Sequence, residues 1–141
     1  MTAPTSNIVV RARPSSLARV RRWLNKTLVD RGASESARSD LALAVTELCT
    51  NIIRHGYRGA DGTIEVSATV STRGFEVTVL DQAPVFALPE FRTIAAGEAL
   101  REGGFGIPLI QALVDEIRHE ALGERGNRVR LVKYREARDA P

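Results

Sequence analysis

Two kinds of apolar spacing alternate along this chain, and their order restricts the folds that it can adopt. In residues 17–28 and 41–52, apolar side chains recur every three or four positions, which predicts two amphipathic helices. In residues 64–70 and 75–79 they recur at every second position, which predicts two strands that each bury one face. A β-branched run at residues 8–10 precedes the helices and predicts a further strand.

The boundaries of these elements carry the expected residue types. Ser34 or Ser36 can accept a hydrogen bond from the first turn of the second helix. Gly32 is placed to end the first helix and Gly56 to end the second, because glycine favours the backbone conformation that follows a helix. The short connector at residues 72–74 predicts a hairpin between two antiparallel strands.

A third helix and two more strands are predicted near the C-terminal end. Glycines at 103–106 open a helical pattern that continues to Val114, and strands follow at about 116–122 and 128–134 around a turn at 123–127. The resulting order of elements implies an α/β protein. We expect a two-layer sandwich, with the helices on one face of a mixed, mostly antiparallel sheet.

Residues 82–102 show no firm periodicity, and in a compact domain such an interval is more often a functional lid than a fold element. No internal repeat or low-complexity linker divides the chain. We therefore expect a single domain over residues 1–141, with a core from about 8 to 135 and short frayed ends.

Composition favours a cytoplasmic protein. The single cysteine, Cys49, excludes an intramolecular disulfide and fits a reducing compartment. No apolar run approaches the roughly 20 residues that cross a bilayer, so we expect no membrane partner. Five arginines lie within residues 11–22, but the net charge is only +3, which favours a solvated or partner-facing helix over a nucleic-acid surface.

Polar residues on the second helix form the first candidate site. Glu47, Asn51 and His55 are spaced four residues apart, so on one α-helix they line a single stripe. Such a stripe is ordinarily the solvated face of an amphipathic helix. Its oxygen atoms are also the kind that hold Mg²⁺ next to phosphates, and a neighbouring carboxylate can serve as a general base.

Two further features could contact a ligand. Asp81 stands where a strand ends, where aspartate is commonly a turn residue and where its carboxylate can also accept a hydrogen bond from a ligand amine. The glycines at 103–106 precede a helix, whose N-terminus presents free N–H groups to an anion. Their spacing matches neither the dinucleotide fingerprint nor the phosphate loop.

In combination and order, these features resemble the ATP-binding superfamily of gyrase, the ninety-kilodalton heat-shock chaperone, histidine kinases and mismatch-repair ATPases. The small anti-sigma-factor serine kinases are the nearest likeness within it. Residues 45–57 look like their N box, Asp81 to Phe86 like their G1 box and Gly103 to Ile110 like their G2 box, while Gly126-Asn127 is similar to their Gly-Asn/Thr turn. The resemblance implies the Bergerat, or histidine-kinase-like ATPase, fold with an ATP lid at about 82–102.

The resemblance also implies the cofactors ATP and Mg²⁺ and a role for each matching residue. Asn51 would ligate Mg²⁺, Glu47 would take the proton of an incoming serine hydroxyl, and Asp81 would accept from the adenine amine. Arg101 of the lid would neutralise phosphate charge during transfer. The other cofactor-binding positions that the resemblance implies are His55, Ala83, Gly103, Gly104, Phe105, Gly106, Ile107 and Asn127.

Two residues depart from the family pattern. Ala83 replaces the glycine of the G1 box, which could strain the loop or weaken ATP binding, and Pro108 is unusual although proline is tolerated in a first helical turn. Neither removes an implied catalytic side chain.

The implied function is an anti-sigma factor that is also a protein serine kinase. Its substrate would be an anti-anti-sigma (STAS-domain) antagonist and its other partner a sigma factor or another regulator. A homodimer through the strand at residues 8–11 and the first helix is implied as well, without direct contact to nucleic acid. The alternative is a non-catalytic protein-binding switch module with weak or structural ATP binding.

Overall fold

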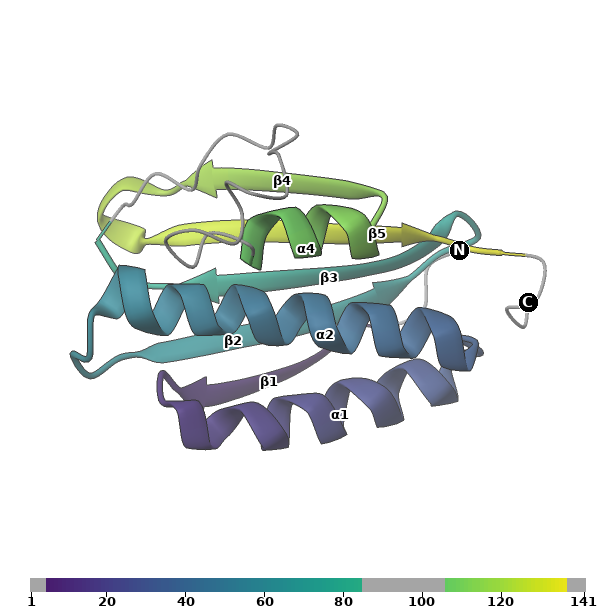
Figure 1. Ribbon diagram of the computed structural model, residues 1–141, viewed down its shortest axis with the longest axis horizontal. Helices are drawn as coiled ribbons and strands as arrows, with labels where there is room; N and C mark the ends of the chain where they lie inside the picture. Colours follow the sequence, from purple (N-terminus) through teal and green to yellow (C-terminus); the bar gives the residue numbers. More distant parts are fainter. Residues whose placement is uncertain (1–4, 85–105, 137–141) are drawn as a thin grey trace.

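The computed structural model describes residues 5–84 and 106–136, and within them five strands form one sheet in the order β1-β2-β3-β5-β4. All four neighbouring pairs are antiparallel, whereas the sequence led us to expect a mixed, mostly antiparallel sheet. Each helix or strand runs in the opposite direction to the one before it (Figure 1). Two helices separate β1 from β2, and α4 and β4 separate β3 from β5, so the strands of each of these pairs are also antiparallel. The strands are β1 Ser6–Arg11, β2 Thr63–Val70, β3 Gly74–Asp81, β4 Glu116–Ala121 and β5 Asn127–Tyr134.

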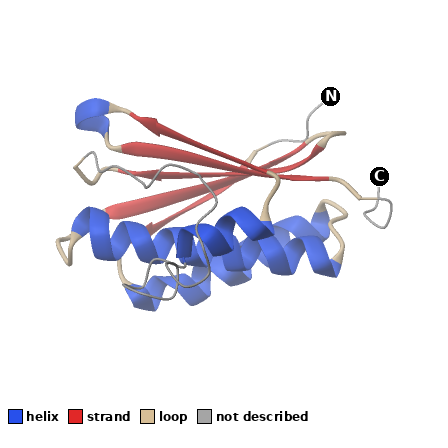
Figure 2. Cartoon of the chain, turned by 45° about the horizontal axis from the view of Figure 1, so that its top comes forward, coloured by secondary structure: helices blue, strands red, loops and turns tan. Residues whose placement is uncertain are grey.

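In the described part of the chain, three α-helices cover one face of this sheet, which confirms the predicted two-layer α/β sandwich (Figures 1 and 2). They are α1 Leu17–Asp30, α2 Glu35–Asn51 and α4 Gly106–Leu113. Short 3₁₀ turns precede α1 at Pro14–Ser16 and join β4 to β5 at Gly123–Arg125. Helix α2 lies between α1 and α4, and its C-terminal end points toward the end of the sheet where β3 finishes.

The core lies between the helices and the sheet. The inward residues of β2 and β3 alternate with outward ones, and Phe75 at the start of β3 is fully buried. Leu24 and Leu41 pack against them from α1 and α2. Cys49 belongs to this core as well, and burial raises the pKa of its thiol to about 12, so the thiol stays protonated at neutral pH.

The end of the second helix differs from the sequence prediction. Ser34 does cap α2, accepting a hydrogen bond from the Ala37 N–H at 3.1 Å. The helix does not stop at Gly56, however. Its α-helical part ends at Asn51, and a π-helical segment follows at Ile52–Tyr57 before Arg58 adopts a left-handed conformation with φ of 53°. Short π-helical segments are often found at functional sites.

Lys133 ties α4 to the rest of the fold. Its ammonium group lies 3.0 Å from the carboxylate of Asp40 on α2 and donates to the Leu113 carbonyl at the end of α4, over 3.2 Å. Only 12% of the Lys133 side chain is exposed. A cation at a helix C-terminus also complements the helix dipole, so this one side chain connects β5, α2 and α4.

The expected lid at 82–102 falls almost entirely outside the described residues, of which only 82–84 belong to it. Among residues 5–84 and 106–136, no helix combines the length and apolarity that a membrane crossing requires.

Candidate functional site

The last residue of β3 is a buried carboxylate. Asp81 is 2% exposed and points inward, toward the helix layer, because it continues the alternation of Phe75, Val77 and Val79. Its Oδ1 atom accepts two hydrogen bonds of 3.0 Å each, from the backbone N–H of Ala83 and from Nδ2 of Asn127. This oxygen is therefore satisfied within the fold.

The second carboxylate oxygen of Asp81 has no partner. Oδ2 is buried and makes no hydrogen bond to any of the described residues. Burial raises the pKa of Asp81, while the two hydrogen bonds to Oδ1 act in the opposite direction. An unpaired buried acceptor costs stability, and such a group is most readily explained by a ligand that supplies the missing donor.

Asn127 reaches Asp81 because Gly126 allows two backbones to approach. Gly126 has φ of 93°, and a side chain there would collide with the carbonyl oxygen of Asp81. Asn127 is fully buried at the start of β5, directly opposite Asp81 in the register. Its Oδ1 lies 3.1 Å from Nε2 of His119 on β4. A chain of hydrogen bonds thus runs from β4 through β5 to the end of β3.

Tyr57, the last residue of the π-helical segment, holds the chain that follows Asp81. Its hydroxyl accepts from the backbone N–H of Gln82 at 2.8 Å and donates to the carbonyl of Thr63 at 2.6 Å. The ring is buried, and burial raises the pKa of the phenol, which keeps the donating proton in place. The end of α2 and the end of β3 are connected through this group.

Ala83 fits the loop without backbone strain. Its side chain is 1% exposed and its φ is not positive. Its backbone N–H donates to Oδ1 of Asp81, which closes a turn at the end of β3. The strain that the replacement of glycine suggested is therefore not observed. Pro108 lies in the first turn of α4, where proline is tolerated as expected.

The three polar residues of the expected stripe divide between two kinds of helix. Glu47 and Asn51 are half-buried in the last turns of α2, whereas His55 is exposed in the π-helical segment. Neither Glu47 nor Asn51 makes a side-chain hydrogen bond or ion pair with the described residues. Both are thus available to a ligand.

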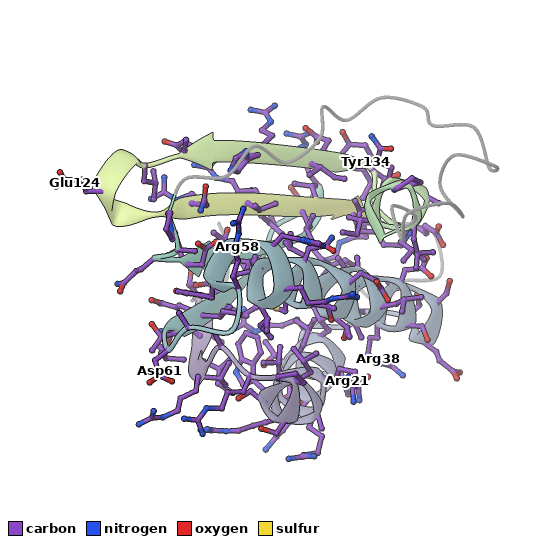
Figure 3. All side chains as sticks on the ribbon, turned by 60° about the vertical axis from the view of Figure 1, so that its left-hand side comes forward. Arg21, Arg38, Arg58, Asp61, Glu124 and Tyr134 are labelled. Atoms are coloured by element: carbon purple, nitrogen blue, oxygen red, sulfur yellow. The ribbon has the colours of Figure 1, made fainter. Side chains whose placement is uncertain are left out.

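A hollow of about 540 Å³ joins the end of this helical segment to the chain after β3. Its lining residues are His55, Gly56, Tyr57, Arg58, Ala60, Asp61, Gln82 and Pro84. Arg58 stands where the helix layer meets the strand ends (Figure 3). The structure therefore brings the expected N-box and G1-box segments side by side around one hollow.

Some predicted site residues cannot be placed. Arg101, Gly103, Gly104 and Phe105 lie outside the described residues, and only the backbone of Gly106 and Ile107 is described, at the start of α4. No cluster of three or more His, Cys, Asp or Glu side chains suited to a metal occurs in residues 5–84 and 106–136. A cation at Asn51 would accordingly take most of its ligands from phosphate and water, as Mg²⁺ commonly does.

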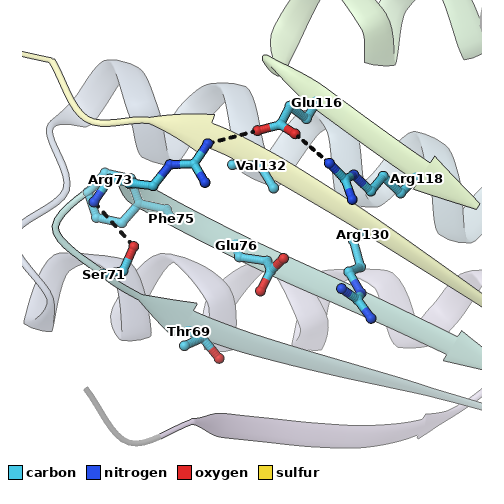
Figure 4. Close-up of a pocket in the computed structure, with 10 residues that line it drawn as sticks. Thr69, Ser71, Arg73, Phe75, Glu76, Glu116, Arg118, Arg130 and Val132 are labelled. Carbon is cyan, nitrogen blue, oxygen red and sulfur yellow. Dashed lines mark hydrogen bonds and ion pairs between the residues drawn. The ribbon is translucent and has the colours of Figure 1, made fainter. Parts of the chain in front are cut away.

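A second hollow lies elsewhere and is of a different kind. It measures about 310 Å³ and opens on the face of the sheet opposite the helices, at the Gly74 end of β3 (Figure 4). Arg73 and Arg118 are exposed there, and the half-buried Glu116 pairs with both, at 3.5 Å and 3.4 Å. It contains no buried unpaired group comparable to Asp81.

The arginine-rich helix presents its charge to the outside. Arg19, Arg21 and Arg22 are exposed on α1, and Arg21 lies on the same side of the helix layer as Arg38 of α2 (Figure 3). Arg38 donates to Asn25 Oδ1 at 3.1 Å and to the Ala33 carbonyl at 2.7 Å. This surface is separate from the hydrogen-bond network around Asp81.

Comparison with known proteins matches residues 10–133 to the model of the histidine kinase-like ATPase domain. The chain belongs to this ATPase family. A serine-protein kinase RsbW of Bacillus licheniformis is 32% identical over 132 residues, covering 87% of this chain and 81% of the relative. The Bacillus subtilis protein of the same name is 28% identical over 133 residues, covering 89% and 82%.

A solved structure agrees with this assignment. The crystal structure of the RsbU and RsbW domains of a Mycobacterium tuberculosis protein has a TM-score of 0.68 and 26% identity to this histidine kinase-like ATPase domain. The match covers 99% of this chain and 35% of that longer one. The resemblance to the anti-sigma-factor serine kinases and the predicted fold are thereby confirmed.

Sequence reasoning missed two contributors to this ATPase-family site. Tyr57 belongs to the N-box motif, but the sequence indicated no role for its side chain. Its two hydrogen bonds, to Thr63 and Gln82, are seen only in the folded structure. His119 carried no signal, because it lies within a short strand and far in sequence from Asp81.

Proposed function

We propose that this chain is an ATP-dependent protein serine kinase and anti-sigma factor that modifies a STAS-domain antagonist in the cytoplasm. The observation that best supports it is the buried Oδ2 of Asp81, which has no donor among the described residues. An adenine ring presents an exocyclic amine, whose N–H is the donor that this oxygen lacks. A guanine ring presents a carbonyl at that position and would meet the carboxylate with repulsion.

The remaining residues suit phosphoryl transfer by positioning and electrostatics. Mg-ATP, when bound, supplies the phosphoryl group together with a cation that offsets its charge, and the amide oxygen of Asn51 is the ligand that this chain offers to that cation. Asn51 is half-buried and has no competing hydrogen bond among the described residues. His55, Ala83 and Asn127 complete the adenine side of the site, and Gly103–Ile107 the phosphate side.

Glu47 is proposed as the general base. A serine hydroxyl of the partner protein forms a bond from its oxygen to the γ-phosphorus, while the bond from that phosphorus to the β,γ-bridging oxygen breaks and ADP leaves. The hydroxyl proton passes to the carboxylate of Glu47, one helical turn before Asn51. Arg101 is proposed to offset the charge on the transferring group.

Partner exchange follows from the added charge. A phosphoserine carries close to two negative charges, so the modified antagonist would no longer fit the surface that the unmodified one occupies. The freed surface could then hold a sigma factor or another regulator. A homodimer through β1 and α1 belongs to the same proposal.

The first experiment tests the nucleotide site. The thermal midpoint of the purified chain is measured with and without millimolar Mg-ATP, and again with Asp81→Asn. A ligand that binds only the folded state stabilises it by about 2.7 kcal/mol at a concentration of 100 times its Kd. We expect a clear rise in the wild type and none in Asp81→Asn. No rise in the wild type would reject ATP binding.

The second experiment tests transfer. ATP labelled at the γ-phosphate is incubated with the chain and a STAS-domain protein from the same genome, and the label on the STAS protein is counted. Glu47→Gln should retain ATP binding and lose transfer, while Glu35→Gln, in the exposed first turn of α2, should retain both. ATP binding with no transfer by the wild type would favour the non-catalytic switch module.

A further inference from the structure

The buried ammonium group of Lys133 fixes the C-terminal end of α4 against α2. It lies 3.0 Å from Oδ2 of Asp40 on α2 and donates to the carbonyl oxygen of Leu113, the last residue of α4, over 3.2 Å. Helix α4 packs against α2, and the two lie side by side in the helix layer (Figure 1). The contact through Lys133 therefore determines where α4 lies along α2.

The position of this contact also determines which residue of α2 lies beside the start of α4. The two helices run in opposite directions (Figure 1). Leu113 and Gly106 are seven residues apart, and so are Asp40 and Glu47. Each pair spans a rise of about 10 Å along its helix. Because Asp40 is held next to Leu113, the start of α4 lies close to the level of Glu47.

Glu47 also lies on the same face of α2 as Asp40. Seven residues are nearly two full turns, so the two side chains differ by only about 20° around the helix axis. Asn51 follows one turn after Glu47. The backbone N–H groups of Gly106 and Ile107, in the first turn of α4, have no intrahelical acceptor and suit phosphate oxygens. Phosphates held between this turn and Asn51 would also lie beside Glu47.

A small movement of α4 is enough to disturb this arrangement. The helix has eight residues and is therefore about 12 Å long. A pivot of roughly 5° at its C-terminal end would move its first turn by about 1 Å. A misplacement of about 1 Å can lower the rate of a reaction about a hundredfold.

We infer that Lys133 and Asp40 form a positioning pair, which holds α4 in the register on α2 that places the phosphates next to Asn51 and Glu47. The inference rests on the proposed nucleotide site. Lys133 does not touch the nucleotide in this account, because it acts through the far end of α4.

The first test compares a ligand that has phosphates with one that has none. The Kd values of Mg-ADP and adenosine are measured by calorimetry, well below the thermal midpoint of each variant. Lys133→Met should weaken Mg-ADP about tenfold and leave adenosine unchanged, because the adenine side at Asp81 lies outside α4. Lys133→Arg keeps a donor for both partners and should restore the affinity for Mg-ADP.

The rate of transfer provides a second readout in the same variants. With saturating ATP and the STAS-domain protein as substrate, Lys133→Met should lower kcat about a hundredfold. The value of kcat/KM for the STAS-domain protein should fall by the same factor, because the binding of that protein is unchanged. An unchanged kcat in Lys133→Met would overturn the inference.

A merely structural role of Lys133 predicts a different pattern. Val20→Ala removes buried methyl groups from α1, on the other side of α2, and is the matched control for lost stability. It should bind both ligands like the wild type. Equal weakening of Mg-ADP and adenosine in Lys133→Met, or no restoration in Lys133→Arg, would overturn the inference. If Lys133→Met does not fold, Asp40→Asn takes its place and should show a smaller loss in the same direction.

The last test needs no nucleotide and separates the inference from the proposed function. Amide hydrogen exchange is measured in the free protein. Lys133→Met should raise the exchange rates of the α4 amides about tenfold relative to those of β2, and Lys133→Arg should return them toward the wild-type values. Unchanged rates in Lys133→Met overturn the inference even if the wild type binds ATP. A wild type that binds no nucleotide rejects the proposed function, while the exchange rates still decide whether Lys133 holds α4 in place.

Discussion

Asn127 stands directly opposite Asp81 across β5 and β3, and its amide donates to one carboxylate oxygen over 3.0 Å while the other oxygen stays unbonded. The fold thus holds the carboxylate in place through one oxygen and provides no hydrogen-bond donor for the other among the described residues. Groups of this kind lower the stability of the free protein and are found where a ligand completes the hydrogen bonding.

Asp81→Asn should therefore stabilise the protein while abolishing its response to ATP. Asparagine can still accept from Ala83 and Asn127 through one oxygen, but it no longer buries a charge. We expect the free energy of unfolding at pH 7 to rise by about 1 kcal/mol, measured by urea denaturation. Asp61→Asn, at a side chain that is 91% exposed, should change it by less than about 0.5 kcal/mol. A loss of stability in Asp81→Asn would show that the ionised carboxylate supports the fold.

The difference in free energy of unfolding between Asp81→Asn and the wild type should depend on pH. Because the pKa of Asp81 is raised in the folded protein from its ordinary value of 3.8, the folded state holds the proton more tightly than the unfolded state. The stabilisation from this proton is complete below 3.8 and is lost as the pH rises through the folded pKa. The advantage of Asp81→Asn over the wild type should thus be smallest at acid pH and should grow to a plateau. An advantage that shrinks with rising pH would contradict the raised pKa.

Tyr57→Phe removes the hydroxyl that joins the end of the helical segment to Gln82. It leaves a backbone N–H and a carbonyl without their partner, so we expect a loss of about 1–3 kcal/mol in the free energy of unfolding. ATP should also bind more weakly, because the chain after Asp81 is no longer held. Tyr134→Phe, at a residue that is 40% exposed, should be nearly neutral in both measurements. Similar effects of the two substitutions would argue against a special role for Tyr57.

Gly126→Ala and Gly123→Ala form a matched pair in one turn. Both glycines have positive φ, which costs an alanine roughly 1–2 kcal/mol. Only at Gly126 does the new methyl group also meet the backbone of Asp81 and Gln82; at Gly123 nothing lies within 4 Å. Thermal denaturation should show the larger loss for Gly126→Ala, and only this variant should lose the ATP-induced shift. Equal losses of stability in the two variants would mean that the backbone of Asp81 and Gln82 can move away from the new methyl group at little cost.

Lys133→Met tests the connection between β5, α2 and α4. The ammonium group is mostly buried and has two partners, so its removal should cost about 1–3 kcal/mol. Asp40 is 32% exposed, and Asp40→Asn should cost less. In a double-mutant cycle the two substitutions should show a coupling energy of about 1 kcal/mol, and additive effects would exclude a direct interaction.

Local spacing predicted the elements and their order. The alternation in β2 and β3 and the apolar stripes of α1 and α2 are properties of neighbouring residues, and the residues that cap or end a helix act over a single turn. The family motifs then directed attention to Asp81, Asn51 and Asn127.

Contacts between distant residues could not be predicted in the same way. Periodicity does not indicate that Tyr57 bonds to Gln82 or that His119 bonds to Asn127, because these pairs depend on the sheet register and on close backbone approach at Gly126. The all-antiparallel sheet likewise follows from how consecutive elements reverse, and the π-helical end of α2 has no composition signal of its own.

Because Asp81 pairs with Asn127, the site can form only after β5 has been synthesised. The two residues are 46 positions apart, and β5 is the last strand of the sheet to leave the ribosome. A nascent chain that has already made β1, β2 and β3 holds Asp81 without the strand that orients it. Under the proposed function, nucleotide recognition would be reserved for chains whose final strand has docked, and an incomplete copy would not compete for the ligand.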